Sequence, residues 1–166
     1  MPLTLILTRH AKSAWDDPTV DDFDRTLNGR GRSDAPKIGE WLAAQGFLPD
    51  TVLVSGARRT VETWERMAPT LPKTCTMESA PARFHASAQT ILDVLKTRRS
   101  PSIMIICHNP GIAEFARRIV NTPPDHPKFS QYPTCATAVI EFDAPAWSAI
   151  DWETGALQDF IVPKDL

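Results

Sequence analysis

The chain has 166 residues, of which 42% are hydrophobic and 23% charged, a balance typical of one globular domain. Its formal net charge of −2 excludes a general basic surface for nucleic acid or acidic membranes. No stretch is apolar for long enough to span a bilayer, and the N-terminal run lacks the features of a secretory signal. We therefore expect a single domain over residues 1–166, with no nucleic-acid or membrane partner. Because the three cysteines form no CxxC pair, we expect reduced thiols and a cytoplasmic location.

Short apolar runs alternate with segments of helical periodicity along the chain. The runs predict strands, in order, at Leu3–Thr8, Thr51–Ser55, Cys75–Ser79, Ser102–Cys107, Ala136–Phe142 and Ala156–Val162. The periodic segments predict helices from Asn28 or Ser33 to Gln45, over Ala57–Met67, over Ala88–Thr97 and after Asn109. We expect Gly46 to end the first helix and Asn109 to cap the last, with Pro110 in its first position. Polar loops are expected at Asp16–Arg25 and Asn121–Pro133. This alternation predicts an α/β fold, a three-layer α/β/α domain with a mostly parallel central sheet.

Three predicted strands end in residues that suit phosphate chemistry. In parallel sheets ligands gather beyond the carboxyl ends of the strands. Arg9 and His10 follow the first strand, Ser55 and Arg59 follow the second, and His108 follows the strand that ends at Cys107. Arginine matches phosphate oxygens with two donors, and a neutral imidazole can attack phosphorus. Each segment alone has an ordinary structural explanation, but the three together favour a phosphoryl site.

The helix after the second predicted strand adds a spacing argument. Ser55, Arg59 and Thr63 are four residues apart and would share one helix face. Arg59 would then lie near the helix N-terminus, where anions are favoured. Arg58 points about a quarter turn away; either it shares the phosphate pocket or it pairs with Glu62.

The motifs Thr8-Arg-His-Ala-Lys-Ser13, Ser55-xxx-Arg59-xxx-Thr63 and His108-Asn-Pro-Gly111 resemble the histidine phosphatase (phosphoglycerate mutase-like) superfamily. The short length and the segment Asp24-Arg-Thr-Leu27 are similar to its phosphohistidine phosphatase SixA branch. The resemblance implies a phosphoglycerate mutase-like fold, no cofactor and no metal. It implies that His10 is the nucleophile, that Arg9 and Arg59 bind the phosphoryl oxygens, and that His108 steadies the transferring group. Further substrate contacts are expected from Ser55, Asn109 and Arg25, although Arg25 could instead pair with Asp22 or Asp24.

Two departures from larger relatives bear on the substrate. Asn109 follows His108 where some relatives carry an acid, and Arg83-Phe84-His85-Ala86 also lacks one. No general acid is evident, although His85 could act as acid or base or be an exposed loop residue. This pattern favours a P–N substrate such as phosphohistidine over an alkyl phosphate. The absence of a long insertion predicts a shallow, open site that admits a protein surface, with a small phosphate ester as the alternative substrate.

The sequence also contains partial matches to other classes of phosphatase and metal site. Asp22-Phe-Asp-Arg-Thr26 matches the motif of metal-dependent haloacid dehalogenase-type phosphatases, but no buried strand precedes it. None of the cysteines has the downstream arginine of a cysteine phosphatase, and the four histidines lack zinc-ligand spacing. A non-catalytic relative that only binds phosphoprotein stays open.

Overall fold

The computed structural model describes residues 2–80 and 85–166. A six-stranded sheet with the order β3-β2-β4-β1-β5-β6 runs through the molecule. Its strands are β1 (Leu3–Arg9), β2 (Thr51–Val54), β3 (Thr76–Ser79), β4 (Ser102–Cys107), β5 (Thr137–Phe142) and β6 (Ala156–Ile161). Strand β5 runs antiparallel to both its neighbours, while the β3-β2-β4-β1 pairs are all parallel. The predicted α/β class and mostly parallel sheet are therefore confirmed.

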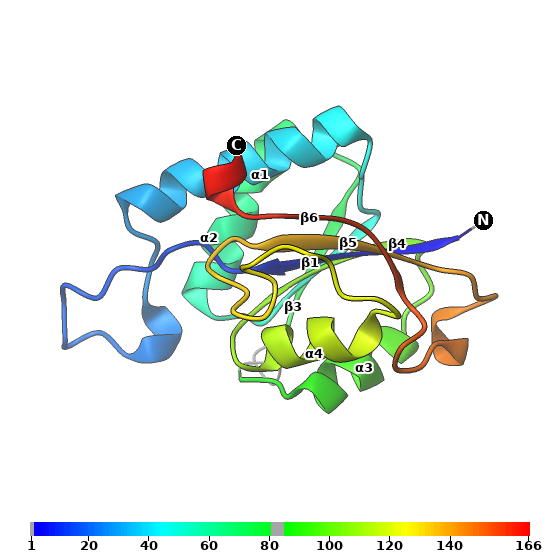
Figure 1. Cartoon of the computed structure of the whole chain (residues 1–166). Coiled ribbons are helices and arrows are strands. Elements are labelled where there is room, and N and C mark those ends of the chain that lie inside the picture. Colours follow the sequence, from blue (N-terminus) through cyan, green and yellow to red (C-terminus); the bar gives the residue numbers. More distant parts are fainter. Residues whose placement is uncertain (1, 81–84) are drawn as a thin grey trace.

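Helices cover both faces of this sheet (Figure 1). Helices α1 (Gly29–Gln45) and α2 (Arg58–Met67) lie on one face, and α3 (Ala88–Lys96) and α4 (Gly111–Ile119) lie on the other. Short 3-10 turns are η1 (Asp22–Asp24), η2 (Ala68–Thr70), η4 (Trp147–Ala149) and η5 (Pro163–Asp165). None of the described helices is long and apolar enough to cross a membrane.

The central strands are apolar on both sides because both sides are buried. Alternate residues of β1 and β4 pack toward α3 and α4, namely Leu5, Leu7, Ile103 and Ile105. The residues between them pack toward α1 and α2, namely Ile6, Met104 and Ile106. Such strands read as continuous apolar runs, which is why the sequence located them within a residue or so.

Helix α1 begins at the earlier of the two expected starts, and its expected end is confirmed. The Asn28 side chain accepts a hydrogen bond from the Gly31 amide at 2.9 Å, as an N-cap does. Gly46 ends the helix with φ of +79°, the left-handed region that favours glycine.

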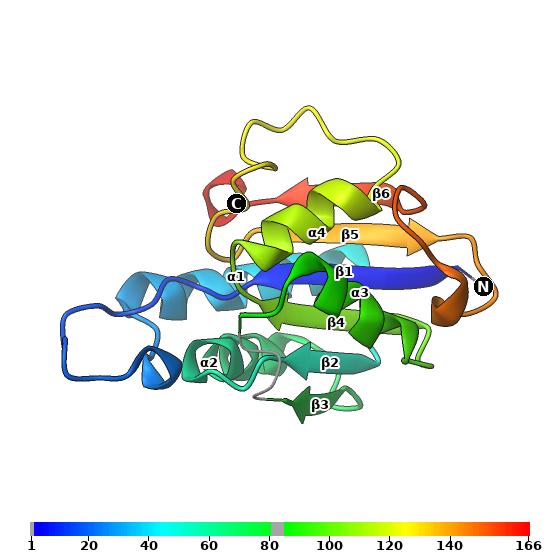
Figure 2. The ribbon, with the colours of Figure 1, turned by 90° about the horizontal axis from the view of Figure 1, so that it is seen from below.

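Residues 13–27 form a loop that leaves the carboxyl end of β1 and returns to α1 (Figure 2). A bridge between Ser13 and Leu27 and a 2.8 Å bond from the Ala14 amide to the Thr26 carbonyl close its base. The turn η1 belongs to this 13–27 loop and packs against α2. The loop thereby carries polar side chains back over the strand ends.

Candidate active site

Three neighbouring strands, β1, β4 and β2, present their carboxyl ends at one edge of the sheet (Figure 2). His10 follows β1, His108 follows β4 and Ser55 follows β2. The His10 amide continues the ladder by donating to the Cys107 carbonyl at 3.1 Å. The ring centroids of His10 and His108 are consequently only 5.2 Å apart.

The His10 imidazole is buried and oriented. Its Nδ1 lies 2.7 Å from the Ala11 carbonyl oxygen. A carbonyl only accepts, so Nδ1 carries the hydrogen and Nε2 of the neutral ring keeps its lone pair. Burial, opposed by the Ala11 hydrogen bond and reinforced by the charges of His108, Arg9 and Arg59, lowers the His10 pKa to about 3. The ring is therefore held neutral, the form in which a histidine attacks.

A threonine of α2 fixes the backbone beside this ring. Thr63 Oγ1 accepts the Ala11 amide hydrogen at 2.9 Å and donates to the Arg59 carbonyl at 2.6 Å. The sequence placed Thr63 on the helix face of Arg59 without assigning it a role. Here it ties the His10 segment to the helix that carries Arg59.

His108 is held by hydroxyl groups. Its Nε2 shares a 2.6 Å hydrogen bond with Ser55 Oγ, which in turn lies 3.1 Å from Thr60 Oγ1. Burial first, and then the nearby Arg59 charge, lower the His108 pKa to about 3. Two neutral imidazoles therefore face the same small region. Ser55 contacts His108 rather than lying on α2, which begins only at Arg58.

The two predicted arginines approach the same region. Arg9 donates to the Tyr132 carbonyl at 3.3 Å, and burial followed by the Arg59 charge lowers its pKa. Arg59 donates to the Asp22 carbonyl at 2.6 Å and contacts the Asp22 carboxylate at 3.3 Å. Two guanidinium groups that repel each other favour an anion between them.

Two other candidate residues, Arg25 and Arg58, contact side chains of the protein itself. Arg25 packs over the Trp15 ring at 4.0 Å and pairs with Asp22 at 3.9 Å, as the structural alternative expected, and a contact with phosphate stays a prediction. Arg58 pairs with Glu65 at 2.6 Å on the exposed side of α2, so the expected pairing with Glu62 is wrong. Glu62 is instead buried and engaged by Arg32 and Arg66.

Asn109 does not cap α4, which corrects the sequence prediction. The residue before the first turn is Pro110, without a side-chain cap. The Asn109 amide donates instead to the carbonyls of Gln131 and Tyr132, at 2.9 and 3.2 Å. These two bonds anchor the 129–135 segment beside the site, and they hold the side chain so that its oxygen, which a cap would use as the acceptor, receives no hydrogen bond from any described residue.

Sequence reasoning did not assign Asp22 to the site. Its carboxylate lies 3.3 Å from Arg59 and 3.6 Å from His85 Nε2, and the His85 ring centroid is 6.0 Å from that of His108. Arg83 and Phe84, weighed earlier with His85, lie outside the described residues. The Asp22 motif forms the exposed turn η1 rather than a strand end, which contradicts the dehalogenase-type alternative.

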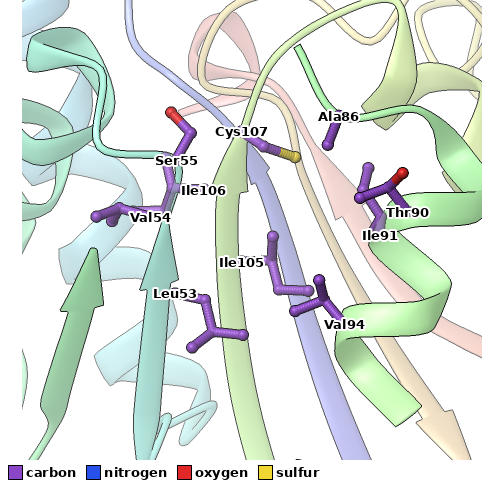
Figure 3. A pocket seen from close by; sticks show the side chains of 10 residues that line it. All are labelled: Leu53, Val54, Ser55, Ala86, Thr90, Ile91, Val94, Ile105, Ile106 and Cys107. Carbon is purple, nitrogen blue, oxygen red and sulfur yellow. The ribbon is translucent and has the colours of Figure 1, made fainter. Parts of the chain in front are cut away.

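Two hollows flank these residues. An apolar cavity of about 20 Å³ lies between the sheet and α3, with Ser55 and Cys107 at its upper end (Figure 3). It has room for no more than about one water molecule and is too small for a substrate. A groove of about 630 Å³ runs past His85 and Asn109 and along the start of α4 to Arg117. This groove is the larger of the two hollows, and the histidine that lines it is His85.

Within residues 2–80 and 85–166, no cluster of three or more His, Cys, Asp or Glu side chains is arranged to hold a metal ion. Metal independence stays a prediction.

The three layers of helices, sheet and helices, with histidines at two neighbouring strand ends and arginines beside them, define a phosphoglycerate mutase-like α/β fold. Residues 5–82 match the family model of the histidine phosphatase superfamily (branch 1). Over these residues, somewhat under half of its length, the chain is similar to the histidine phosphatase superfamily.

The comparisons include close structural relatives. A candidate phosphohistidine phosphatase SixA from Agrobacterium tumefaciens is 26% identical with a TM-score of 0.79, over 98% of this chain and 99% of that one. A second, from Nakamurella multipartitia, is 22% identical with a TM-score of 0.80, over 98% and 97% of the two chains, and shows the common fold. An uncharacterised chloroplast protein of Arabidopsis thaliana is 29% identical over 86% of this chain and 68% of its own length.

Proposed function

We propose that this protein is a phosphatase in which His10 attacks phosphorus and forms a phosphohistidine intermediate. The observation that carries the proposal is the His10 ring itself. It is buried, its Nδ1 is tied to the Ala11 carbonyl, and it lies 5.2 Å from His108. Its Nε2 is therefore a preorganised nucleophile beside two guanidinium groups that match phosphoryl oxygens.

The chemistry takes two steps. In the first, a bond forms between His10 Nε2 and phosphorus while the bond to the leaving group breaks. In the second, water attacks phosphorus, the phosphorus–nitrogen bond breaks, and orthophosphate leaves with His10 neutral again. Arg9 and Arg59 stabilise the phosphoryl oxygens, and His108, steadied by Ser55, donates or accepts hydrogen bonds at the same group.

The favoured substrate is a protein that carries phosphohistidine, as in SixA-like enzymes. The likeness to the candidate SixA of Agrobacterium supports this choice. So does the open groove beside His85 and Asn109, which offers room for polypeptide on either side of the phosphorylated residue. A small phosphate ester is the second candidate. The reduced cysteines agree with the cytoplasm as the proposed compartment.

The test is to trap the intermediate. Protein mixed briefly with a radiolabelled phosphohistidine protein and quenched in alkali should retain acid-labile label. His10→Ala should retain none, while Arg58→Ala, whose side chain lies outside the site, should label normally. Equal labelling of the His10→Ala protein would reject the nucleophile.

Turnover separates the enzyme from a relative that only binds. A panel of phosphohistidine proteins and small phosphate esters, with and without chelator, should show phosphate release that is fastest for a phosphohistidine protein and indifferent to chelator. Binding of the same phosphoproteins without any release would identify a binding module instead.

A further inference from the structure

Breaking the bond to a poor leaving group requires a proton at the leaving atom, and this inference about its source rests on the proposed function. His10 is the proposed nucleophile, so it cannot also supply this proton. His108 is buried and bound to Ser55, and burial with the Arg59 charge lowers its pKa to about 3. A neutral imidazole of this kind is a poor proton donor at neutral pH. The donor must therefore come from elsewhere on the rim.

A third imidazole lies on that rim. His85 precedes α3 and faces His108, with 6.0 Å between the ring centroids. Its side chain is 61% exposed, so it lies where the substrate must enter. Its φ of +61° is in the left-handed region, which residues other than glycine seldom occupy and which occurs often at functional sites. An imidazole has two ring nitrogens, so one can face the leaving atom while the other contacts a neighbouring side chain.

A carboxylate from a distant segment meets this imidazole. Asp22 Oδ2, on the 13–27 loop, lies 3.6 Å from His85 Nε2 and 3.3 Å from Arg59 Nη2. A carboxylate partner orients an imidazole and stabilises its protonated form once a proton has been taken up. The Asp22 carboxylate also pairs with Arg59 at 3.3 Å and with Arg25 at 3.9 Å, which fix its position on the rim.

We propose that His85 is the catalytic proton donor to the leaving atom and that Asp22 is the residue that positions it. The ring centroids of His10 and His85 lie 5.2 and 6.0 Å from that of His108. A phosphoryl group beside His108 therefore has the nucleophile and the proposed donor within reach.

The proton balance closes over both steps. As His10 Nε2 bonds to phosphorus, the leaving oxygen or nitrogen departs with its electron pair and takes a proton from the His85 imidazolium. Neutral His85 then accepts a proton from the water that attacks the phosphohistidine. The products are the protonated leaving group and orthophosphate. With this donor the site is equipped for phosphate monoesters with poor leaving groups as well as for phosphohistidine.

The test compares leaving groups. Release of the leaving group in the first turnover is measured for 4-nitrophenyl phosphate, phenyl phosphate and an alkyl phosphate, with wild type, His85→Gln and a control, His126→Gln. The control removes another histidine that pairs with a carboxylate, Asp165 at 3.0 Å, outside the site. His85→Gln should slow the phenyl and alkyl esters about 100-fold and 4-nitrophenyl phosphate less than about threefold. His126→Gln should match wild type.

A His85→Gln protein that keeps wild-type rates on all three esters, or that loses the same factor on each, would overturn the donor role. Circular dichroism shows whether an equal loss on all three esters comes from misfolding of His85→Gln. In that case His85→Asn is tested on the same three esters, and the proposal stands only if its loss of rate is larger for the poorer leaving groups. Failure of the proposed function looks different, since wild-type protein would then release no leaving group and form no phosphohistidine, and the donor role would fall with it.

Discussion

Arg59 holds Asp22 by two contacts, one to its backbone carbonyl at 2.6 Å and one to its carboxylate at 3.3 Å. The side chain proposed to bind a phosphoryl group is thus already paired with an anion of the protein's own 13–27 loop. A substrate phosphate must share Arg59 with this carboxylate or displace it. Asp22 therefore has opposed effects, since it weakens anion binding while it positions His85.

Replacement of Asp22 should separate these two effects. In Asp22→Asn the competing negative charge is gone, so the inhibition constant for orthophosphate and the KM should both fall about two- to fivefold. The expected change is modest because the Arg59–Asp22 pair is partly exposed. The kcat for phenyl phosphate should fall at the same time. Steady-state kinetics with orthophosphate as inhibitor measure both. Asp24→Asn, on an exposed residue of the same turn, should change neither. A rise in KM after Asp22→Asn would contradict the competition.

Acid should destabilise the fold through the buried imidazoles. His10 and His108 both have folded-state pKa values of about 3, below the ordinary histidine value. Below about pH 6.5 the unfolded chain therefore binds protons at these two histidines that the folded chain does not bind. The stability that the two neutral imidazoles contribute is complete above about pH 6.5 and is lost as the pH falls toward 3. The slope is about 1.4 kcal/mol per pH unit for each group.

Urea unfolding between pH 6 and pH 5, where most carboxylates stay ionised, measures this slope. His10→Asn and His108→Asn should each flatten it by about one group's share. An unchanged slope in both variants would show that neither imidazole is held neutral.

Glu62 anchors the end of the 13–27 loop. Its buried carboxylate accepts the Leu27 amide hydrogen at 2.9 Å and the Arg32 Nε hydrogen at 3.0 Å. Glu62→Ala should cost about 1–3 kcal/mol of unfolding free energy, because the buried Leu27 amide loses its partner. Glu65→Ala, on the exposed partner of Arg58, should cost less than about 1 kcal/mol. Thermal unfolding compares them, and equal losses would mean that Glu62 is no anchor.

Close packing at Gly111 should control the position of His85. A Cβ at Gly111 would lie 2.0 Å from the Ala86 carbonyl oxygen, so Gly111→Ala must push the residue after His85 away. We expect a loss of about 1–3 kcal/mol and a slower release of phenol from phenyl phosphate. Gly29→Ala meets nothing within 4 Å and serves as the control. Wild-type melting and kinetics for Gly111→Ala would contradict this packing argument.

The buried central strands could be predicted well from the sequence, for a physical reason. A strand covered on both faces must be apolar throughout, so Ser102–Cys107 was recognised over its full length. The rule that ligands gather at strand ends then placed His10 and His108 together. The end of the first helix at Gly46 was also predicted correctly, because it depends on the conformational freedom of that one glycine.

The rim could not be predicted in the same way. Asp22 reaches Arg59 only because the 13–27 loop folds back, and that path depends on distant contacts such as the Leu27 amide with Glu62. Asn109 was expected to cap a helix by local preference, but carbonyls more than twenty residues away bind its amide. Side chains whose positions depend on long-range contacts of polar loops leave no periodic signal.

The main chain at His10 is secured from both sides of β1. Its amide donates to the Cys107 carbonyl on the β4 side at 3.1 Å, and its carbonyl accepts from the Cys135 amide at 3.0 Å. Amide deuterium uptake at this position should be among the slowest in the molecule. Asp22 and His85, by contrast, come from exposed turns. We expect mutations in those turns to change which molecules the rim admits, while the His10 ring, whose main chain the sheet holds, keeps its position.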